Sequence, residues 1–224
     1  MHSPRIKICG LTSPAEAVFC VEAGVHAVGL VFFPKSPRNV SPEQAREITR
    51  VLPGEVAKVG VFVNAAYDAI MDIVDRADLS AVQLHGDEPP ELAEALHRQG
   101  LTVLKAFYVT TRPDLGSALR FPSATSLVEW GKGVLPGGNA LTWGDETPPL
   151  PRSRPLVIAG GLRPDTVADI IQRFRPDGVD ASSGVELEPG KKSFEKIKMF
   201  TQVVGKIHLP DPIKEPFTHA PTYA

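Results

Sequence analysis

The stretch Arg5-Ile6-Lys7-Ile8-Cys9-Gly10-Leu11-Thr12 is the part of the sequence from which the fold can be worked out. Basic and apolar residues alternate up to the cysteine, as in a strand, and Ser13-Pro14 then starts a helix. This predicts a strand over Ile6–Cys9 with the Cys9 thiol at its carboxyl end. Free cysteines are often buried and inert, so this stretch alone leaves open whether Cys9 is reactive.

Short apolar runs and helix-like segments alternate along the rest of the chain. Further strands are expected at Val25–Phe32, Val56–Val63, Ala81–Leu84, Thr102–Phe107, Ser126–Glu129, Leu156–Ala159 and Gly178–Asp180. Helices are expected at Pro14–Glu22, from Pro42 to about Leu52, and at Ala66–Ala77, Pro90–Gln99, Pro113–Arg120, Pro164–Phe174 and Ser193–Val204. Continuous apolar strands are typical of a parallel sheet that is covered on both faces.

This alternation predicts an α/β fold, a (βα)8 or TIM barrel in a single domain. An open doubly wound sheet is the alternative, with fewer strands and a reversal in strand order. The sixth strand–helix unit is expected to be irregular, because residues 131–155 are rich in glycine and proline and show no clear helix. We expect the barrel domain to span residues 1–205 and residues 206–224 to form an extended, loosely held, proline-rich C-terminal tail.

Composition narrows the class of protein. The 224 residues carry a formal net charge of −2, which gives no basic field for nucleic acid. There is no apolar run of about 18 residues and no signal-peptide pattern at the N-terminus. With only Cys9 and Cys20, no disulfide framework is expected. We therefore expect a cytoplasmic protein without nucleic-acid or membrane partners.

Two glycine-rich turns follow the last two predicted strands. In barrels, the loops at these positions commonly bind phosphate through exposed backbone amides. The turns are Ala159-Gly160-Gly161-Leu162 and Asp180-Ala181-Ser182-Ser183-Gly184-Val185-Glu186. They predict a phosphate site that contains Gly160, Gly161, Ser182, Ser183 and Gly184.

Three polar residues end or follow other predicted strands. Arg38 lies in a proline-framed loop and could hold an anion, although a solvated loop arginine would look the same. His85 could move protons or simply be hydrogen-bonded at the rim. Glu129 could be a general acid with a raised pKa, or part of a rim ion pair. The other histidines show no metal-ligand spacing, so no metal is expected.

Together these strand ends offer a thiol, a carboxyl, a histidine and an arginine opposite a phosphate site. That combination indicates proton transfer on a sugar phosphate. A thiolate can act as general base if its neighbours lower its pKa from about 8.5 towards neutrality.

Six motifs in this order resemble those of the phosphoribosylanthranilate isomerases, collinear over about residues 5–204. They are Lys7-Ile8-Cys9-Gly10-Leu11-Thr12, Ser36-Pro37-Arg38, Val61-Phe62-Val63-Asn64, Gln83-Leu84-His85-Gly86-Asp87-Glu88, Ala159-Gly160-Gly161-Leu162 and Val179-Asp180-Ala181-Ser182-Ser183-Gly184-Val185-Glu186.

The resemblance implies an enzyme of tryptophan biosynthesis that needs no cofactor. Such enzymes carry out the Amadori rearrangement of N-(5-phosphoribosyl)anthranilate to 1-(2-carboxyphenylamino)-1-deoxyribulose 5-phosphate, an aldose–ketose isomerisation. A carboxylic acid protonates the furanose ring oxygen and opens the ring to a Schiff base. A cysteine thiolate then removes the C2 proton, and the enolamine tautomerises to the ketone. A phosphosugar substrate and a monomer or homodimer are implied.

Residue by residue, the resemblance assigns Cys9 as the base and Arg38 as the group that holds the anthranilate carboxylate. Asp180 faces the substrate, and His85 lies near it. Glu129 occupies the position of the aspartate that is the general acid in the family, and its side chain is one methylene longer.

Other positions also depart from the family pattern. Residues 137–140 read Gly-Gly-Asn-Ala instead of Gly-Gly-Thr-Gly, Thr166 replaces an asparagine, and Lys192-Ser193 replaces a lysine–aspartate pair. Two alternatives to the isomerase follow from these changes. One is a barrel re-specialised for another aminoaldose phosphate, and the other is a phosphosugar-binding barrel with degraded catalysis.

Overall fold

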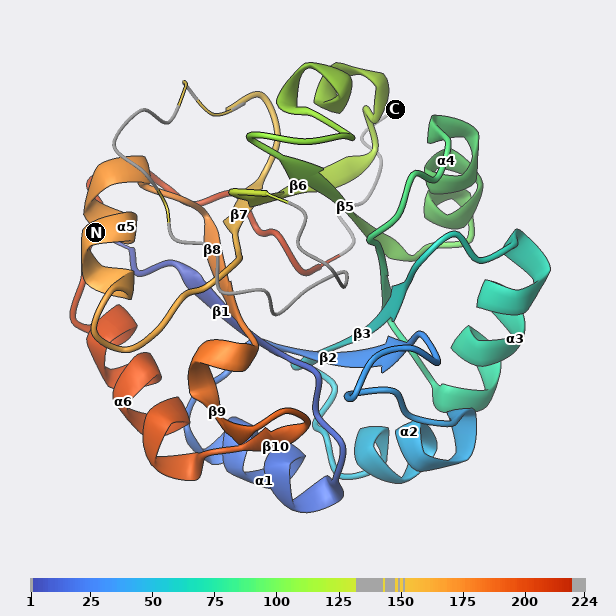
Figure 1. The fold of residues 1–224 in the computed structure, drawn as a ribbon, viewed down its shortest axis with the longest axis horizontal. Helices are drawn as coiled ribbons and strands as arrows, with labels where there is room; N and C mark the ends of the chain where they lie inside the picture. Colours follow the sequence, from blue (N-terminus) through green and yellow to red (C-terminus); the bar gives the residue numbers. More distant parts are fainter. Residues whose placement is uncertain (1, 132–142, 144–147, 149, 151, 219–224) are drawn as a thin grey trace.

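The computed structural model describes residues 2–131, 143, 148, 150 and 152–218. Eight parallel strands form a closed barrel in chain order, with helices around it (Figure 1). The barrel strands are β1 (Arg5–Cys9), β2 (Ala27–Phe32), β3 (Ala57–Phe62), β4 (Ala81–Leu84), β5 (Thr102–Tyr108), β6 (Ala124–Glu129), β7 (Leu156–Ile158) and β8 (Gly178–Ala181). The predicted barrel is confirmed, and the pairing of β8 with β1 excludes the open sheet.

The helices lie outside the barrel. They are α1 (Pro14–Glu22), α2 (Pro42–Thr49), α3 (Tyr67–Ala77), α4 (Pro90–Arg98), α5 (Val167–Phe174) and α6 (Phe194–Gly205). Short 3-10 helices occur at η1 (Leu115–Arg120) and η2 (Ser183–Val185), and β9 (Glu186–Glu188) pairs with β10 (Lys191–Lys192) as a small antiparallel hairpin.

The opening stretch folds as its pattern predicts. Ser13 caps α1, accepting a hydrogen bond from the Glu16 backbone, while the Glu16 side chain accepts one from the Ser13 backbone. Strand β1 pairs with β2 and β8, and Cys9 lies opposite Gly29. The thiol is therefore held at the carboxyl end of a strand that has a partner on both sides.

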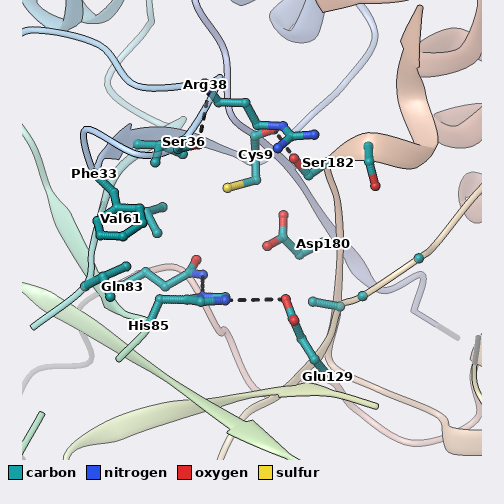
Figure 2. Close-up of a pocket in the computed structure, with 16 residues that line it drawn as sticks. Cys9, Phe33, Ser36, Arg38, Val61, Gln83, His85, Glu129, Asp180 and Ser182 are labelled. Atoms are coloured by element: carbon teal, nitrogen blue, oxygen red, sulfur yellow. Dashed lines mark hydrogen bonds and ion pairs between the residues drawn. The ribbon is translucent and has the colours of Figure 1, made fainter. Parts of the chain in front are cut away.

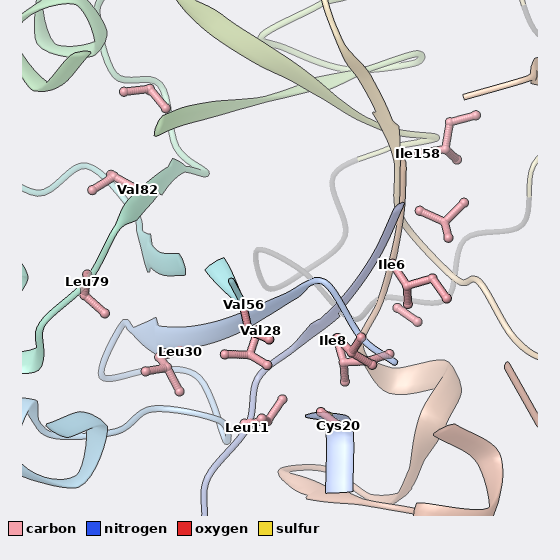
Figure 3. Close-up of a cluster of buried hydrophobic side chains, with 14 of the residues drawn as sticks. Ile6, Ile8, Leu11, Cys20, Val28, Leu30, Val56, Leu79, Val82 and Ile158 are labelled. Atoms are coloured by element: carbon pink, nitrogen blue, oxygen red, sulfur yellow. The ribbon is translucent and has the colours of Figure 1, made fainter. Parts of the chain in front are cut away.

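Alternate residues of β1 face opposite sides of the barrel wall. Ile6 and Ile8 point outward and pack with Cys20 of α1 and with Val28 in the main apolar layer between strands and helices (Figure 3). Cys20 is thus an apolar core residue, whereas Cys9 faces the other way and lines the pocket described below.

The structure differs from the sequence-based expectations in the fifth unit. The helix expected over Pro113–Arg120 is the 3-10 helix η1, which starts at Asp114 as its N-cap. Gly116 in this segment disfavours a regular α-helix. The sequence pattern also does not predict the hairpin β9–β10. Most of the irregular sixth unit, including residues 137–140, lies outside the described residues.

A second apolar cluster fills the barrel interior from the amino ends of the strands up to the pocket. It contains Ala27, Ala57, Val59, Ala81, Leu104, Ala106, Tyr108, Leu127, Val157, Ala159 and Phe217. Val59, Ala81 and Leu127 each precede a pocket-lining residue by two positions. They therefore face the barrel interior as well, one layer of side chains below the pocket.

The C-terminal tail closes the amino end of the barrel. Phe217 is 4% exposed, and the Pro216 carbonyl accepts a hydrogen bond from the Thr125 hydroxyl at 3.1 Å. The backbone N–H of Lys214 donates to Asp177 at 2.8 Å. The expectation of a loosely held tail is therefore wrong for the described part that ends at residue 218, because burial of Phe217 anchors it. The division into a domain 1–205 and a tail 206–224 stays a prediction.

Within the described part of the chain, no helix has the length and apolar character needed to cross a membrane.

Candidate active site

A pocket opens at the carboxyl ends of the barrel strands. Its lining includes all five side chains predicted from the sequence as acid, base or substrate contacts, namely Cys9, Arg38, His85, Glu129 and Asp180. Figure 2 shows Cys9 on one side, Glu129 and His85 on the other, and Asp180 between them. The closed barrel therefore gathers residues that are far apart in the sequence into one site.

Cys9 is a buried free thiol. Burial raises the pKa of the thiol, and the negative charge of Asp180 raises it further. The positive charges of Lys7 and Lys192 lower it, but the net shift is upward. The thiol is thus protonated at neutral pH. Its reactivity depends on the balance of charges around it.

Lys7 and Asp180 form an ion pair inside the barrel. Lys7 Nζ lies 2.8 Å from Asp180 Oδ2, and Lys7 is completely buried. Burial opposes the charge on Lys7, but Asp180 and Cys9 together raise its pKa above the ordinary value. The other oxygen, Asp180 Oδ1, has no hydrogen-bond partner within the described residues. Sequence reasoning gave Lys7 no role, although its position two residues before Cys9 places it on the same face.

Glu129 ends β6 and is 7% exposed. Burial raises the pKa of its carboxyl to about 8, the negative charge of Asp180 adds to the rise, and Lys7 opposes it. The carboxyl is therefore protonated at neutral pH, as a general acid must be.

His85 lies beside this acid. Its Nε2 is 3.7 Å from Glu129 Oε1, and its Nδ1 is 2.8 Å from the Gln83 amide nitrogen (Figure 2). An amide NH2 can only donate, so Nδ1 accepts and the ring proton of the neutral histidine lies on Nε2, towards Glu129.

Arg38 is held over the pocket by a buried acid. Its Nε and Nη2 donate to the two oxygens of Glu186 at 2.8 and 2.7 Å. Lys192 Nζ also bonds Glu186, at 2.7 Å. Burial disfavours the charged form of Glu186, but the two cations outweigh it and lower its pKa.

Gly10 gives the Arg38 side chain room. Its φ of +79° suits glycine, and a Cβ there would lie 2.5 Å from Arg38 Cδ. The sequence motif contained Glu186, but nothing in it indicated that this acid meets Arg38.

Both glycine-rich turns reach the pocket. Gly160, Gly161, Ser182 and Ser183 line it, and both Gly160 and Gly161 have positive φ. Gly184 instead serves packing, because a Cβ there would overlap the backbone of the β7–α5 loop. The phosphate-binding role predicted for these residues stays a prediction.

No cluster of three or more histidine, cysteine or acidic residues in the described ranges is arranged to bind a metal ion.

A buried neutral carboxyl facing a thiol, with an arginine at the rim and glycine-rich turns after β7 and β8, defines a class of (βα)8-barrel enzyme. Such a site is suited to acid–base chemistry on an anionic, phosphorylated substrate.

The comparisons with known proteins identify the family. Residues 6–203 match the family described as N-(5'phosphoribosyl)anthranilate (PRA) isomerase. The N-(5'-phosphoribosyl)anthranilate isomerase of Desulfatibacillum aliphaticivorans is 45% identical over 199 residues, covering 88% of this chain and 91% of that protein. The isomerase of Thermotoga maritima is 44% identical, covering 88% of this chain and 96% of that protein. The chain belongs to the phosphoribosylanthranilate isomerase family, as its motifs predicted.

Solved structures agree with this assignment. The crystal structure of the Thermotoga maritima isomerase superposes with a TM-score of 0.80 at 40% identity, covering 91% of this chain and 100% of that one. Another, with a TM-score of 0.77, 39% identity and the same coverage, is an isomerase in complex with reduced 1-(o-carboxyphenylamino)-1-deoxyribulose 5-phosphate.

Proposed function

We propose that this chain converts N-(5-phosphoribosyl)anthranilate to 1-(2-carboxyphenylamino)-1-deoxyribulose 5-phosphate in tryptophan biosynthesis, with Glu129 as acid and Cys9 as base. Family membership supports the reaction. The observation that carries the residue assignment is the neutral carboxyl of Glu129, whose pKa is raised to about 8, in the same pocket as the Cys9 thiol.

Glu129 performs the first step. Its carboxyl proton moves to the furanose ring oxygen, the bond from that oxygen to C1 breaks, and the nitrogen lone pair forms the Schiff base. Gly160 leaves room for this side chain, since a Cβ there would lie 3.3 Å from Glu129 Cβ and 3.5 Å from its Cγ. The carboxyl of the longer side chain lines the pocket and delivers the proton in place of the family's aspartate. The ring proton of His85 helps to stabilise the carboxylate that Glu129 becomes.

Cys9 performs the second step. As a thiolate it takes the C2 proton, and the electron pair moves towards the Schiff-base nitrogen to give the enolamine, which tautomerises to the ketone. The thiol must therefore lose its own proton before this step, which makes its surroundings decisive.

The remaining residues hold the substrate. Arg38 bonds Glu186 through Nε and Nη2, and its Nη1 is left for the anthranilate carboxylate. Asp180 presents Oδ1 to a sugar hydroxyl. The turns at Gly160–Gly161 and Ser182–Ser183 bind the phosphate through backbone amides and hydroxyls.

The test is turnover of phosphoribosylanthranilate by the purified protein, followed as the decay of substrate fluorescence. We expect complete conversion and a product whose mass equals that of the substrate. Absence of turnover in the unmutated protein would contradict the proposal.

For assembly and location we propose a monomer or homodimer in the cytoplasm. One similar structure, 41% identical, is of monomers generated from the dimeric Thermotoga maritima isomerase. Sedimentation velocity at micromolar concentration separates the two states.

A further inference from the structure

The buried lysine beneath the catalytic thiol has no role in the reaction described above. Lys7 lies two residues before Cys9 on β1 and points into the barrel, where it meets Asp180 of β8, its register partner. Most of the buried side chains below it in the barrel are alanine, valine and leucine.

A buried ion pair is weak evidence for stability, because removing two charges from water costs several kcal/mol per ion before their attraction offsets it. An apolar pair of similar volume would extend the layer below. The charge of Lys7 therefore calls for an explanation in the pocket rather than in the core.

Gly29 of β2 shows what the charge contacts. A Cβ at this position would lie 2.6 Å from Cys9 Sγ and 3.1 Å from Lys7 Nζ. The absent side chain thus leaves a space that the thiol and the ammonium share. The hydrogen bond of Lys7 Nζ to Asp180 Oδ2, at 2.8 Å, fixes the ammonium beside this space.

Other charges around the thiol come from several elements. Asp180 faces Cys9 from β8 and Lys192 faces it from β10, while Arg38 and Glu129 line the same pocket from the β2 loop and β6. Lys192 is already bonded to Glu186. Among these groups, Lys7 is the cation whose charge acts most strongly on the thiol.

We propose that Lys7 is the counter-ion of the Cys9 thiolate, with its ammonium held in place by Asp180 Oδ2 and given access to the sulfur by Gly29. Lys7 Nζ and Cys9 Sγ share the space beside Gly29, and Lys7 does not line the pocket, so it is a positioning residue that acts through Cys9. In turnover the thiolate accepts the C2 proton, and Lys7 keeps its own protons throughout. The inference rests on the proposed role of Cys9 as base.

The experiment measures Cys9 alkylation by iodoacetamide between pH 6 and pH 10, in a Cys20→Ala background so that one thiol reacts. Lys7→Met removes the cation and leaves the carboxylate, so the apparent pKa of Cys9 should rise and alkylation at pH 7 should slow about tenfold. Asp180→Asn removes the opposing charge, so the pKa should fall and alkylation should quicken. Circular dichroism checks the fold of each variant.

The test is whether the apparent pKa of Cys9 shifts in opposite directions in Lys7→Met and Asp180→Asn. A structural role for the pair would alter both variants in the same direction, and that result would overturn the inference, as would an unchanged profile in both. Lys7→Met leaves a buried carboxylate and could fail to fold, in which case Asp180→Asn decides alone. The double variant Lys7→Met/Asp180→Asn, without any buried charge from the pair, should have a higher Cys9 pKa than the unmutated protein.

Turnover separates this inference from the proposed function. If the alkylation profiles shift with opposite signs but the unmutated protein does not convert phosphoribosylanthranilate, the thiolate counter-ion stands and the proposed function fails. If turnover is present and the profiles do not shift, the function stands and Lys7 is not the counter-ion. When both hold, Lys7→Met should lower kcat at pH 7 with little change in KM.

Discussion

The two ends of the barrel interior are built in opposite ways. At the carboxyl end, ionisable groups are buried around the pocket, among them the charged Lys7, Asp180 and Glu186 and the neutral Glu129. At the amino end, small and branched apolar residues fill the interior and Phe217 of the C-terminal tail closes it. Buried charges are costly for folding, whereas a packed aromatic ring stabilises it. One end therefore carries the chemistry and the other supports the fold.

The tail that seals the amino end lies beyond the part of the chain that matches the family, which ends at residue 203. Asp177 links it to the barrel: its Oδ2 accepts from the Leu156 backbone and its Oδ1 from the Lys214 backbone, each at 2.8 Å. At the surface, Glu215 accepts from Arg5 Nε at 2.9 Å. Changes at the two ends should therefore have separable effects.

The largest expected effect is that of Cys9→Ser. A serine hydroxyl is too weakly acidic to supply the base, so kcat/KM should fall by about ten-thousandfold, the upper range for one acid–base group. The melting temperature should change little, since the two side chains are similar in size. The matched control, Cys20→Ala, alters the other cysteine in the outer apolar layer and should keep full turnover. An active Cys9→Ser variant would remove Cys9 from the mechanism.

Glu129→Gln should lower kcat/KM by about a hundredfold to a thousandfold, because an amide cannot donate the acid proton in the same way. The pKa of Glu129 is about 8, so the unmutated enzyme should lose activity as the pH rises through about 8. Initial rates between pH 6 and pH 10 measure this limb. Persistence of the same limb in Glu129→Gln would assign it to another group.

The same carboxyl links activity to stability. Its folded-state pKa of about 8 lies above the ordinary value of 4.5, so the folded protein holds a proton that the unfolded chain releases. That contribution is complete below about pH 4.5 and is lost as the pH rises through about 8. Glu129→Gln should therefore unfold at a higher temperature than the unmutated protein at pH 9, the reverse of its effect on activity.

At the amino end, Phe217→Ala should destabilise the protein by about 3–5 kcal/mol through lost burial and a cavity. The melting temperature should fall on the order of 10 °C, while kcat at 25 °C stays unchanged. Differential scanning fluorimetry measures the first quantity and the fluorescence assay the second. Leu119→Ala is the control, because this side chain is 81% exposed, and it should change neither the melting temperature nor kcat. A large loss of kcat in Phe217→Ala would show that the two ends are coupled.

The smallest expected effect is that of Glu186→Gln. The amide keeps one contact to Arg38 but loses the charge that holds the guanidinium, and charge-assisted hydrogen bonds contribute about 1.5–3 kcal/mol. KM should rise about tenfold with kcat within about threefold, because substrate binding and not proton transfer is altered. A fall in kcat at unchanged KM would argue against a role through Arg38.

Much of the site could be predicted because it follows from local patterns. The end of each parallel strand can be read from its apolar run, and these ends meet at one face of a barrel. Cys9, Arg38, His85, Glu129 and Asp180 can be found in this way, and the structure places them in one pocket. The assignment of the family was possible for the same reason, since its motifs are short and lie at these strand ends.

Other features depend on contacts between distant parts of the chain. The Arg38–Glu186 pair joins residues 148 positions apart, and Lys7 meets Asp180 across 173 positions. No local pattern indicates that a lysine in an alternating strand will be buried beside an aspartate. Nor does any local pattern indicate that Phe217, in a proline-rich terminal segment, is buried in the barrel interior.

By itself, the sequence determined the alternation of strands and helices, the thiol at the end of β1 and the polar residues at the other strand ends. These follow from side-chain periodicity and turn chemistry, which act over a few residues. Only the tertiary structure decided that Lys7 lies against Cys9, that Glu186 holds Arg38 and that the tail closes the barrel. Closure of β8 onto β1 sets those distances, and with them the burial and the charge balance of the thiol.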